Sequence, residues 1–189
     1  MGNAYMDLVA ALRLPSHALF CEAVKTIGGV NVRTDVGGGN ILHFLISALK
    51  KEGLRVEDFE TLLDLGADPN AANKEGHTPL HYAVMHPFSL ELTRVLLAHH
   101  AIVDSQDLVG NTPLWRAVMG YRGENERLEI ILLLLSQGTD IHQKNNVGIS
   151  ARDVIVRREE SIFEGGARAE WGLMGTLSAY LGAEAGSLS

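Results

Sequence analysis

The sequence predicts an all-α solenoid of stacked helix-turn-helix units, with divergent units at both ends and about ten helices in all. The first observation is an internal repeat. The segment Gly76-His77-Thr78-Pro79-Leu80-His81-Tyr82-Ala83 returns 34 residues later as Gly110-Asn111-Thr112-Pro113-Leu114-Trp115-Arg116-Ala117. The second is that a leucine-rich stretch and a turn related to Gly-Ala-Asp follow each copy. A period of about 33 residues is typical of repeats that bury their apolar faces against one another.

The glycine that precedes the shared motif marks the register of the repeats. It stands at four positions, Gly38, Gly76, Gly110 and Gly148. We therefore predict one domain, residues 1–189, made of five units. They are an N-terminal cap unit (1–34), three core units (35–72, 73–106 and 107–144), and a degenerate unit with a C-terminal capping helix (145–189).

The N-terminal unit is predicted to be a helix pair, Met6–Leu14 and His17–Ile27, separated by Pro15 and Ser16. A solenoid needs such a divergent end unit because an open end would expose the core. In the first core unit, Asn40 is expected to cap the first helix in place of threonine, and residues 50–55 form an insertion.

The second core unit has the strongest motif. Thr78 is expected to cap its first helix, and Pro79 suits the first helical position, where its missing N–H costs nothing. Leu80 and Ala83 are expected to point into the core, and Pro87 to end or kink the helix.

The third core unit carries Trp115 where the preceding unit has a histidine, and an insertion lies around residues 120–125. Its second helix is predicted over Arg127–Ser136. In the last unit, Ser150 is the expected cap and Glu170–Leu181 a final amphipathic helix.

These motifs resemble ankyrin repeats over roughly residues 35–160. The resemblance implies that His43 and His81 bond to backbone at the helix start and tie neighbouring repeats together. It also implies that partners bind a concave face lined by the first helices and the fingers between repeats.

Composition and motifs argue against several other classes of protein. With a formal charge of −7 and no basic run, the chain is not expected to bind nucleic acid. The densest apolar run, Ile130–Leu135, is too short to span a membrane, and no secretory signal is visible, so we expect a cytoplasmic protein. The single cysteine, Cys21, is interpreted as a small buried apolar residue.

The sequence shows no catalytic or metal-binding pattern, so we expect neither enzymatic activity nor a cofactor. The eight histidines lack the spacing of a zinc site. The Gly37-Gly38-Gly39 run lacks the lysine of a phosphate-binding loop.

The motif residues are expected to pack in the core and between repeats. A partner is therefore expected to contact the variable positions around them. In the two best units these positions are Lys74, Glu75, His77, Met85, His86, Leu108, Val109, Asn111, Met119, Tyr121 and Arg122. Leu108 and Val109 are apolar at an expected finger tip, which is typical of an interface, although packing against the next finger would also explain them. Trp115 is either a binding residue or simple packing in the histidine position.

The predicted function is non-catalytic protein binding by a monomer. Resemblance to bacterial ankyrin proteins suggests an immunity protein that neutralises a toxin, and the acidic charge would suit a basic toxin or effector. The acidic stretch between Glu52 and Glu75 would steer such a partner, or it is only a solvated face. The alternatives are a scaffold, a host-directed effector without inhibitory action, and a self-assembling structural subunit.

Overall fold

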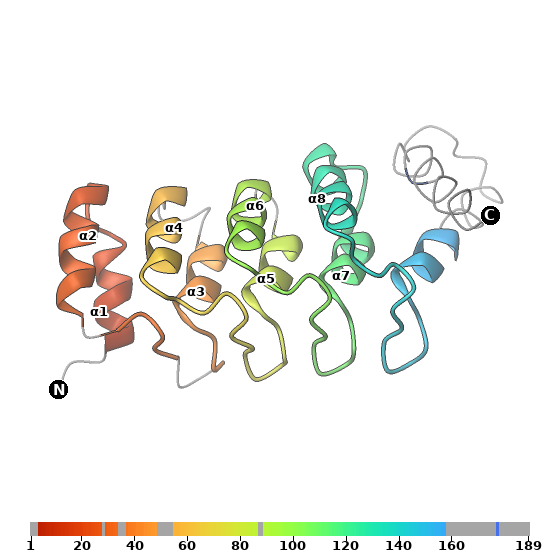
Figure 1. Ribbon diagram of the computed structural model, residues 1–189, viewed down its shortest axis with the longest axis horizontal. Helices are drawn as coiled ribbons and strands as arrows, with labels where there is room; N and C mark the ends of the chain where they lie inside the picture. The colour runs from red at the N-terminus through yellow and green to blue at the C-terminus, as the bar shows by residue number, and fades with distance from the viewer. Residues whose placement is uncertain are drawn as a thin grey trace.

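The computed structural model describes residues 4–27, 29–33, 37–48, 55–86, 89–157 and 177. This part of the chain contains eight helices and, after them, a ninth helical stretch, residues 151–157. The eight are α1 (Ala4–Ala11), α2 (His17–Thr26), α3 (Ile41–Ala48), α4 (Val56–Asp64), α5 (Pro79–Met85), α6 (Leu90–Ala98), α7 (Pro113–Gly120) and α8 (Asn125–Ser136). Figure 1 shows them as pairs set side by side along one axis, which confirms the all-α stacked architecture.

The helices form two rows that pack against each other. The inner row is α1, α3, α5 and α7, and the outer row is α2, α4, α6 and α8; each helix contacts its pair mate and its neighbours along the row. The same motif positions fill the core in successive units, since Leu42, Leu80 and Leu114 are all fully buried. The small Ala83 and Ala117 are also fully buried, which lets adjacent helices approach closely.

The first helices begin at the predicted caps. The Thr78 hydroxyl accepts from the His81 backbone N–H, and Pro79 occupies the first helical turn. Asn40 Oδ1 accepts from the backbone N–H of Leu42, at 3.2 Å. Capping satisfies backbone donors that a helix start otherwise leaves without partners, so these short-range signals decide where each helix begins.

Helix bounds differ from the prediction by a few residues. The first helix ends at Ala11, and two turn-type hydrogen bonds, from Arg13 to Ala10 and from Leu14 to Ala11, carry the chain on to Leu14 before Pro15. This is expected because the residue before a proline avoids helical conformation. The last outer helix begins at Asn125 rather than Arg127. The expected helix Glu170–Leu181 (except Leu177), residues 50–54 of the insertion and Pro87 lie outside the described residues.

The turn after each outer helix needs a left-handed residue. Glycine supplies it at Gly66 (φ 90°) and Gly138 (φ 77°), but His100 occupies the same position after α6 with φ 62°. A side chain is strained in this conformation, whereas glycine is not.

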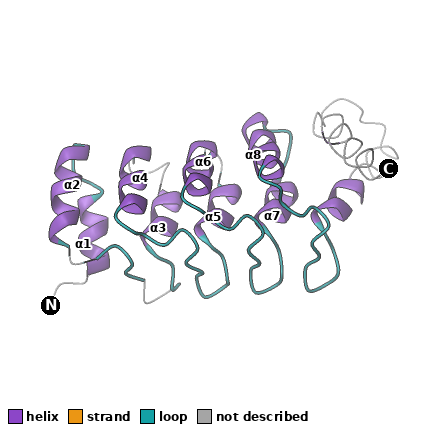
Figure 2. Cartoon of the chain, in the orientation of Figure 1, coloured by secondary structure: helices purple, strands orange, loops and turns teal. Residues whose placement is uncertain are grey.

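The connections between helices contain almost no regular sheet. Figure 2 shows only helices and loops in the described part of the chain, where two isolated antiparallel bridges occur, Arg33 with Asn40 and Lys144 with Ser150. None of the helices in that part has both the length and the apolar character that crossing a bilayer requires.

Candidate functional site

Three hairpins with the same backbone pattern project from the helix rows, and we call them finger A (residues 73–77), finger B (107–111) and finger C (145–149). In each, the backbone N–H of the first residue bonds to the carbonyl of the fifth. The first side chain is Asn73, Asp107 or Asn145, and its Oδ1 accepts from the backbone N–H groups two and four residues later, at 2.9 to 3.1 Å. This local bonding defines the same hairpin conformation within each finger.

Neighbouring fingers are bonded edge to edge. The Leu108 N–H donates to the Glu75 carbonyl at 3.0 Å, and the Asn146 N–H donates to the Val109 carbonyl at 3.1 Å. Glycine is required at the contact because a Cβ on Gly76 would lie 2.6 Å from the Leu108 nitrogen. The three fingers therefore form a continuous, rigid surface.

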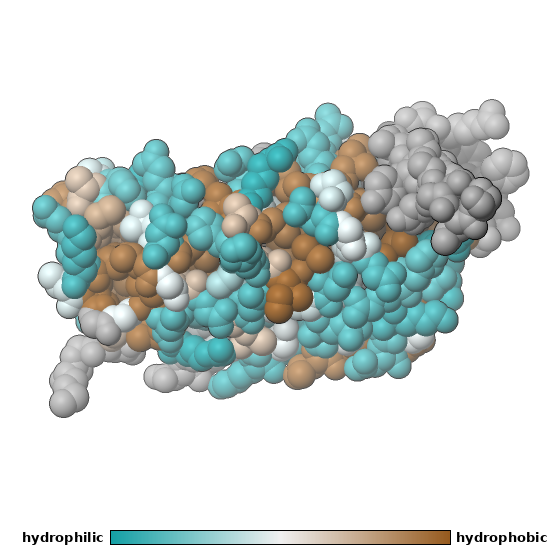
Figure 3. All heavy atoms as spheres, viewed as in Figure 1, coloured by the Kyte–Doolittle hydropathy of each residue, from teal (hydrophilic) through white to brown (hydrophobic). Residues whose placement is uncertain are grey.

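The tips of fingers B and C are apolar and exposed. Leu108 is 70% exposed, Val109 53% and Val147 75%, and we call these three residues the apolar ledge. Apolar side chains are seen along the lower edge of Figure 3, below the helix rows. The alternative that Leu108 and Val109 are buried by the next finger is wrong, because the finger contacts are made by backbone groups and asparagine side chains and leave Leu108 and Val109 exposed.

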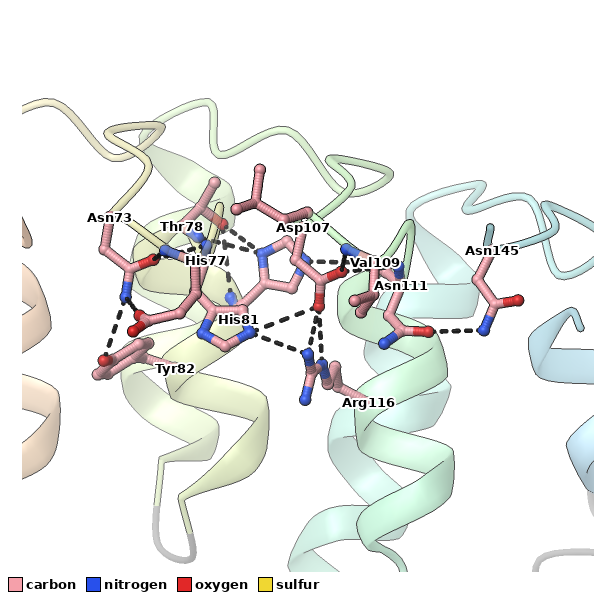
Figure 4. A network of polar contacts seen from close by, with 12 residues as sticks. Asn73, His77, Thr78, His81, Tyr82, Asp107, Val109, Asn111, Arg116 and Asn145 are labelled. Atoms are coloured by element: carbon pink, nitrogen blue, oxygen red, sulfur yellow. Dashed lines mark hydrogen bonds and ion pairs between the residues drawn. The ribbon is translucent and has the colours of Figure 1, made fainter. Parts of the chain in front are cut away.

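A charged network supports finger B, as Figure 4 shows. The Asp107 carboxylate is fully buried and accepts from Arg116 of α7, whose Nε lies 3.0 Å from Oδ2 and whose Nη2 also bonds it. His77 of finger A lies beside the pair, with Nε2 2.9 Å from Arg116 Nη2 and 3.4 Å from Asp107 Oδ2. Three elements of two units are thus joined at the base of the apolar ledge.

Contacts within this network and burial lower the pKa values of both Asp107 and His77. Burial alone would raise the pKa of Asp107, but the hydrogen bond from Arg116 and those from backbone N–H groups lower it below its ordinary value. Burial, followed by the positive charge of Arg116, lowers the pKa of His77, so this imidazole is neutral near pH 7. Finger B therefore rests on an ionised Asp107–Arg116 pair.

A second set of histidines ties the units together, as the resemblance implied. His43 Nε2 lies 2.9 Å from the His77 carbonyl and His81 Nε2 lies 3.0 Å from the Asn111 carbonyl, each in the next unit. Burial lowers the pKa of His81 to about 4 despite the bond to Asn111. At the third position Trp115 packs against the core, and its buried Nε1 has no hydrogen-bond partner in the described part of the chain.

Several predicted contact residues lie on or beside this surface. Lys74 and Glu75 are exposed at the tip of finger A. His77 is mostly buried and belongs to the network with Arg116 and Asp107. Met85 and His86 are partly buried at the end of α5.

Two predicted contact residues are buried, so the structure gives a partner no access to them. Asn111 is bonded to Asn145 of finger C at 2.8 Å. Tyr121 follows α7 and packs in the core cluster, with its backbone N–H bonded to the Val118 carbonyl. Met119 and Arg122 remain exposed, although Arg122 donates to the carbonyls of Met119 and Tyr121.

Sequence reasoning missed two residues of the finger surface, Val147 and Arg116. The register glycine could have found Val147, since it precedes Gly148 as Val109 precedes Gly110. Arg116 carried no such signal, because its importance depends on the carboxylate that the preceding finger places beside it. The described residues hold no group of three or more histidine, cysteine or acidic side chains that could bind a metal.

Comparisons with known proteins agree with this geometry. A family model described as ankyrin repeats in three copies matches residues 42–145, more than half of the chain. Ankyrin repeat-containing protein P1E11.10 of Schizosaccharomyces pombe is 37% identical over 94 residues, which cover 49% of this chain and 41% of that protein. A putative ankyrin repeat protein of Rickettsia felis is 26% identical over 129 residues, covering 66% and 54%.

A third similar protein is the putative ankyrin repeat protein FPV031 of fowlpox virus. It is 33% identical over 133 residues, which cover 68% of this chain and 36% of the viral protein. The chain spans about half, or less, of the length of these three relatives.

Proposed function

Because the chain belongs to the ankyrin-repeat family, whose repeats are protein–protein interaction modules, we propose that it binds a protein partner through fingers A to C. The observation that carries this proposal is the apolar ledge. Three large apolar side chains stand mostly exposed on backbone that is already held in place by hydrogen bonds. Exposed apolar groups on a rigid frame bind with little loss of conformational entropy.

The polar surroundings of the ledge suit a specific interface. Lys74 and Glu75 stand beside it on finger A, and the Arg116 side chain is 24% exposed at its base. Interfaces commonly combine an apolar centre with a polar rim that includes arginine. A partner would therefore place apolar side chains on Leu108, Val109 and Val147, and polar groups around them.

The experiment is a pull-down from native lysate followed by calorimetry on the purified pair. The Leu108→Asp/Val147→Asp variant is compared with Leu65→Asp, since Leu65 is also exposed but lies in the turn after α4, away from the fingers. We expect the finger variant to weaken binding by at least about tenfold, and the control to leave it unchanged. Equal affinity for the finger variant and the wild type would refute the proposed surface.

A more specific proposal is that binding neutralises the partner, as an immunity protein neutralises a toxin. Charge supports it. On the outer row, exposed carboxylates outnumber exposed cations. The carboxylates include Glu57, Glu60, Asp64, Glu91 and Glu129, and the cations are Lys25 and Arg94. An acidic face raises the association rate of a basic partner. Asp58 does not contribute, because it is fully buried, contrary to the solvated face that the acidic stretch suggested.

A scaffold role is the second proposal, and the same charge would serve it. The two are separated by the activity of the purified partner with and without this protein. A fall in activity at equal molar ratio supports neutralisation, whereas a partner that binds and keeps full activity supports the scaffold. Binding that does not weaken as salt rises would count against charge steering in either case.

A further inference from the structure

Away from the fingers, a thiol, an imidazole and a carboxylate meet where α2 packs on α4. Cys21 Sγ lies 3.4 Å from His17 Nε2, one turn earlier on α2. The other ring nitrogen, His17 Nδ1, lies 2.7 Å from Asp58 Oδ1 of α4. A nucleophile, a base and a group that orients the base are thus arranged in series.

The arrangement determines which nitrogen of His17 carries the proton. Asp58 also accepts from Arg55, at 2.8 Å from Nε and 2.7 Å from Nη2, so its carboxylate is an acceptor for both neighbours. Nδ1 is therefore the donating nitrogen of His17, and Nε2 presents its lone pair to the thiol. The Thr61 hydroxyl also faces Nε2, at 3.5 Å.

The supporting carboxylate is buried and held by several bonds, while Cys21 is only partly buried. Asp58 is fully buried, and the Arg55 guanidinium that clamps it also donates to the Leu14 carbonyl. Cys21 and His17 are both partly exposed, His17 by 37% of its side chain. Cys21 packs against the apolar core as expected, but it is only partly buried and its Sγ also contacts His17.

We propose that Cys21 is a modification site, a thiol that His17 activates for exchange with low-molecular-weight disulfides. His17 Nε2 takes the proton of the thiol as Sγ attacks one sulfur of the disulfide RS–SR. The S–S bond breaks, a Cys21–S–SR bond forms, and the leaving RS⁻ takes the proton and departs as RSH. The small disulfide is the oxidant, and His17 ends in its starting state.

The chain suits a direct test because Cys21 is its only cysteine. The second-order rate constant of the folded protein with 4,4′-dithiodipyridine is measured by the release of the coloured thione across about pH 5 to 9. The same protein unfolded in guanidinium chloride gives the unassisted rate. At neutral pH we expect the folded wild type to react at least about tenfold faster than the unfolded chain, and His17→Gln to lose that advantage.

Two further variants separate activation from structure. His99→Gln removes another outer-row histidine that pairs with a carboxylate, Asp64, and should keep the wild-type rate. Asp58→Asn tests the positioning residue, and its pH–rate profile should match that of His17→Gln rather than that of the wild type, because the imidazole is no longer held with Nε2 toward the thiol. Thermal unfolding verifies that each variant is folded. A folded wild type no faster than the unfolded chain, or a folded His17→Gln variant with the wild-type profile, would overturn the proposal.

Mass spectrometry after incubation with oxidised glutathione then asks whether a physiological disulfide is accepted. A single mixed disulfide on Cys21 in the wild type, formed more slowly in His17→Gln, supports the proposal. Equal adduct formation in both proteins contradicts it.

Discussion

Replacing Asp107 by asparagine should test how much the charged network contributes to the stack. The substitution isolates the ion pair, because Asn73 and Asn145 hold fingers A and C by the same two accepted bonds that Asp107 makes in finger B. An amide can therefore keep the hairpin. The amide cannot, however, accept both hydrogen bonds from Arg116, because an NH₂ group that only donates replaces one of the two carboxylate oxygens.

The expected loss follows from burial. Removing one partner of a fully buried ion pair costs about 3–5 kcal/mol, and a hydrogen bond to a charged group contributes about 1.5–3 kcal/mol. Asp107 is fully buried, but Arg116 is 24% exposed and can turn to solvent. We therefore expect a loss of about 2 kcal/mol in the free energy of unfolding, or roughly 1 M in the urea midpoint.

The contribution of the Asp107–Arg116 pair to stability should depend on pH. The pKa of Asp107 is lower in the folded protein than its ordinary value, because the hydrogen bonds from Arg116 and the backbone outweigh burial. The pair thus stabilises fully above about pH 4, and the contribution is lost as the pH falls through the folded pKa. Urea unfolding followed by circular dichroism should show a difference between wild type and variant that shrinks in acid.

A double-mutant cycle with Arg116→Leu provides the control. Arg116→Leu alone should cost at least as much as Asp107→Asn, because it leaves a buried carboxylate without its countercharge. The two losses should not add, with a coupling energy of about 1–3 kcal/mol. Strict additivity, or a difference at neutral pH below about 0.5 kcal/mol, would refute the view that the pair supports finger B.

Three other predictions concern the histidines. Burial lowers the pKa of His81 to about 4 in the folded protein, so folding favours the neutral imidazole. The free energy of unfolding should therefore fall by on the order of 3 kcal/mol as the pH is lowered from about 6.5 to 4. His81→Gln should flatten that part of a stability curve measured by urea unfolding. The pKa of His99 is raised, first by its bond to the Val95 carbonyl and then by Asp64, so its contribution is present below about pH 6.5 and lost as the pH rises through the folded value. His99→Gln should therefore cost about 0.5 kcal/mol in mild acid and nothing at pH 8, and the opposite order would contradict the pairing. His100→Gly should relieve the strain at φ 62°, which should raise the free energy of unfolding by about 0.5–1 kcal/mol and with it the melting temperature, whereas Gly66→Ala in the equivalent turn should lower both.

Local features of the fold could be predicted from the sequence. Thr78, Asn40 and Ser150 cap the helices as expected because a cap involves groups only two or three residues apart. The repeat period placed the helices in order, and the resemblance placed His43 and His81 between units, because each unit buries the same face against the next.

The candidate site depended on contacts between units, and there the prediction was mixed. Leu108 and Val109 are exposed, which is one of the two possibilities that the sequence left open for an apolar pair at a turn, and their role in binding stays a prediction. Tyr121 was misjudged because a loop residue is exposed or buried according to the helices it meets, and these are not its sequence neighbours.

The sequence by itself determined the repeat, the starts of the capped first helices, the family and the general kind of function, since all of these follow from spacing and from short-range bonds. Only the tertiary structure decided which side chains meet across units. It placed Asp107 against Arg116, and Cys21 and His17 against Asp58, which lies 41 residues from His17 in the chain. The physical reason is that an ion pair or a proton relay needs contact within a few ångströms, and the stacking of helices, not the order of residues, brings such groups together.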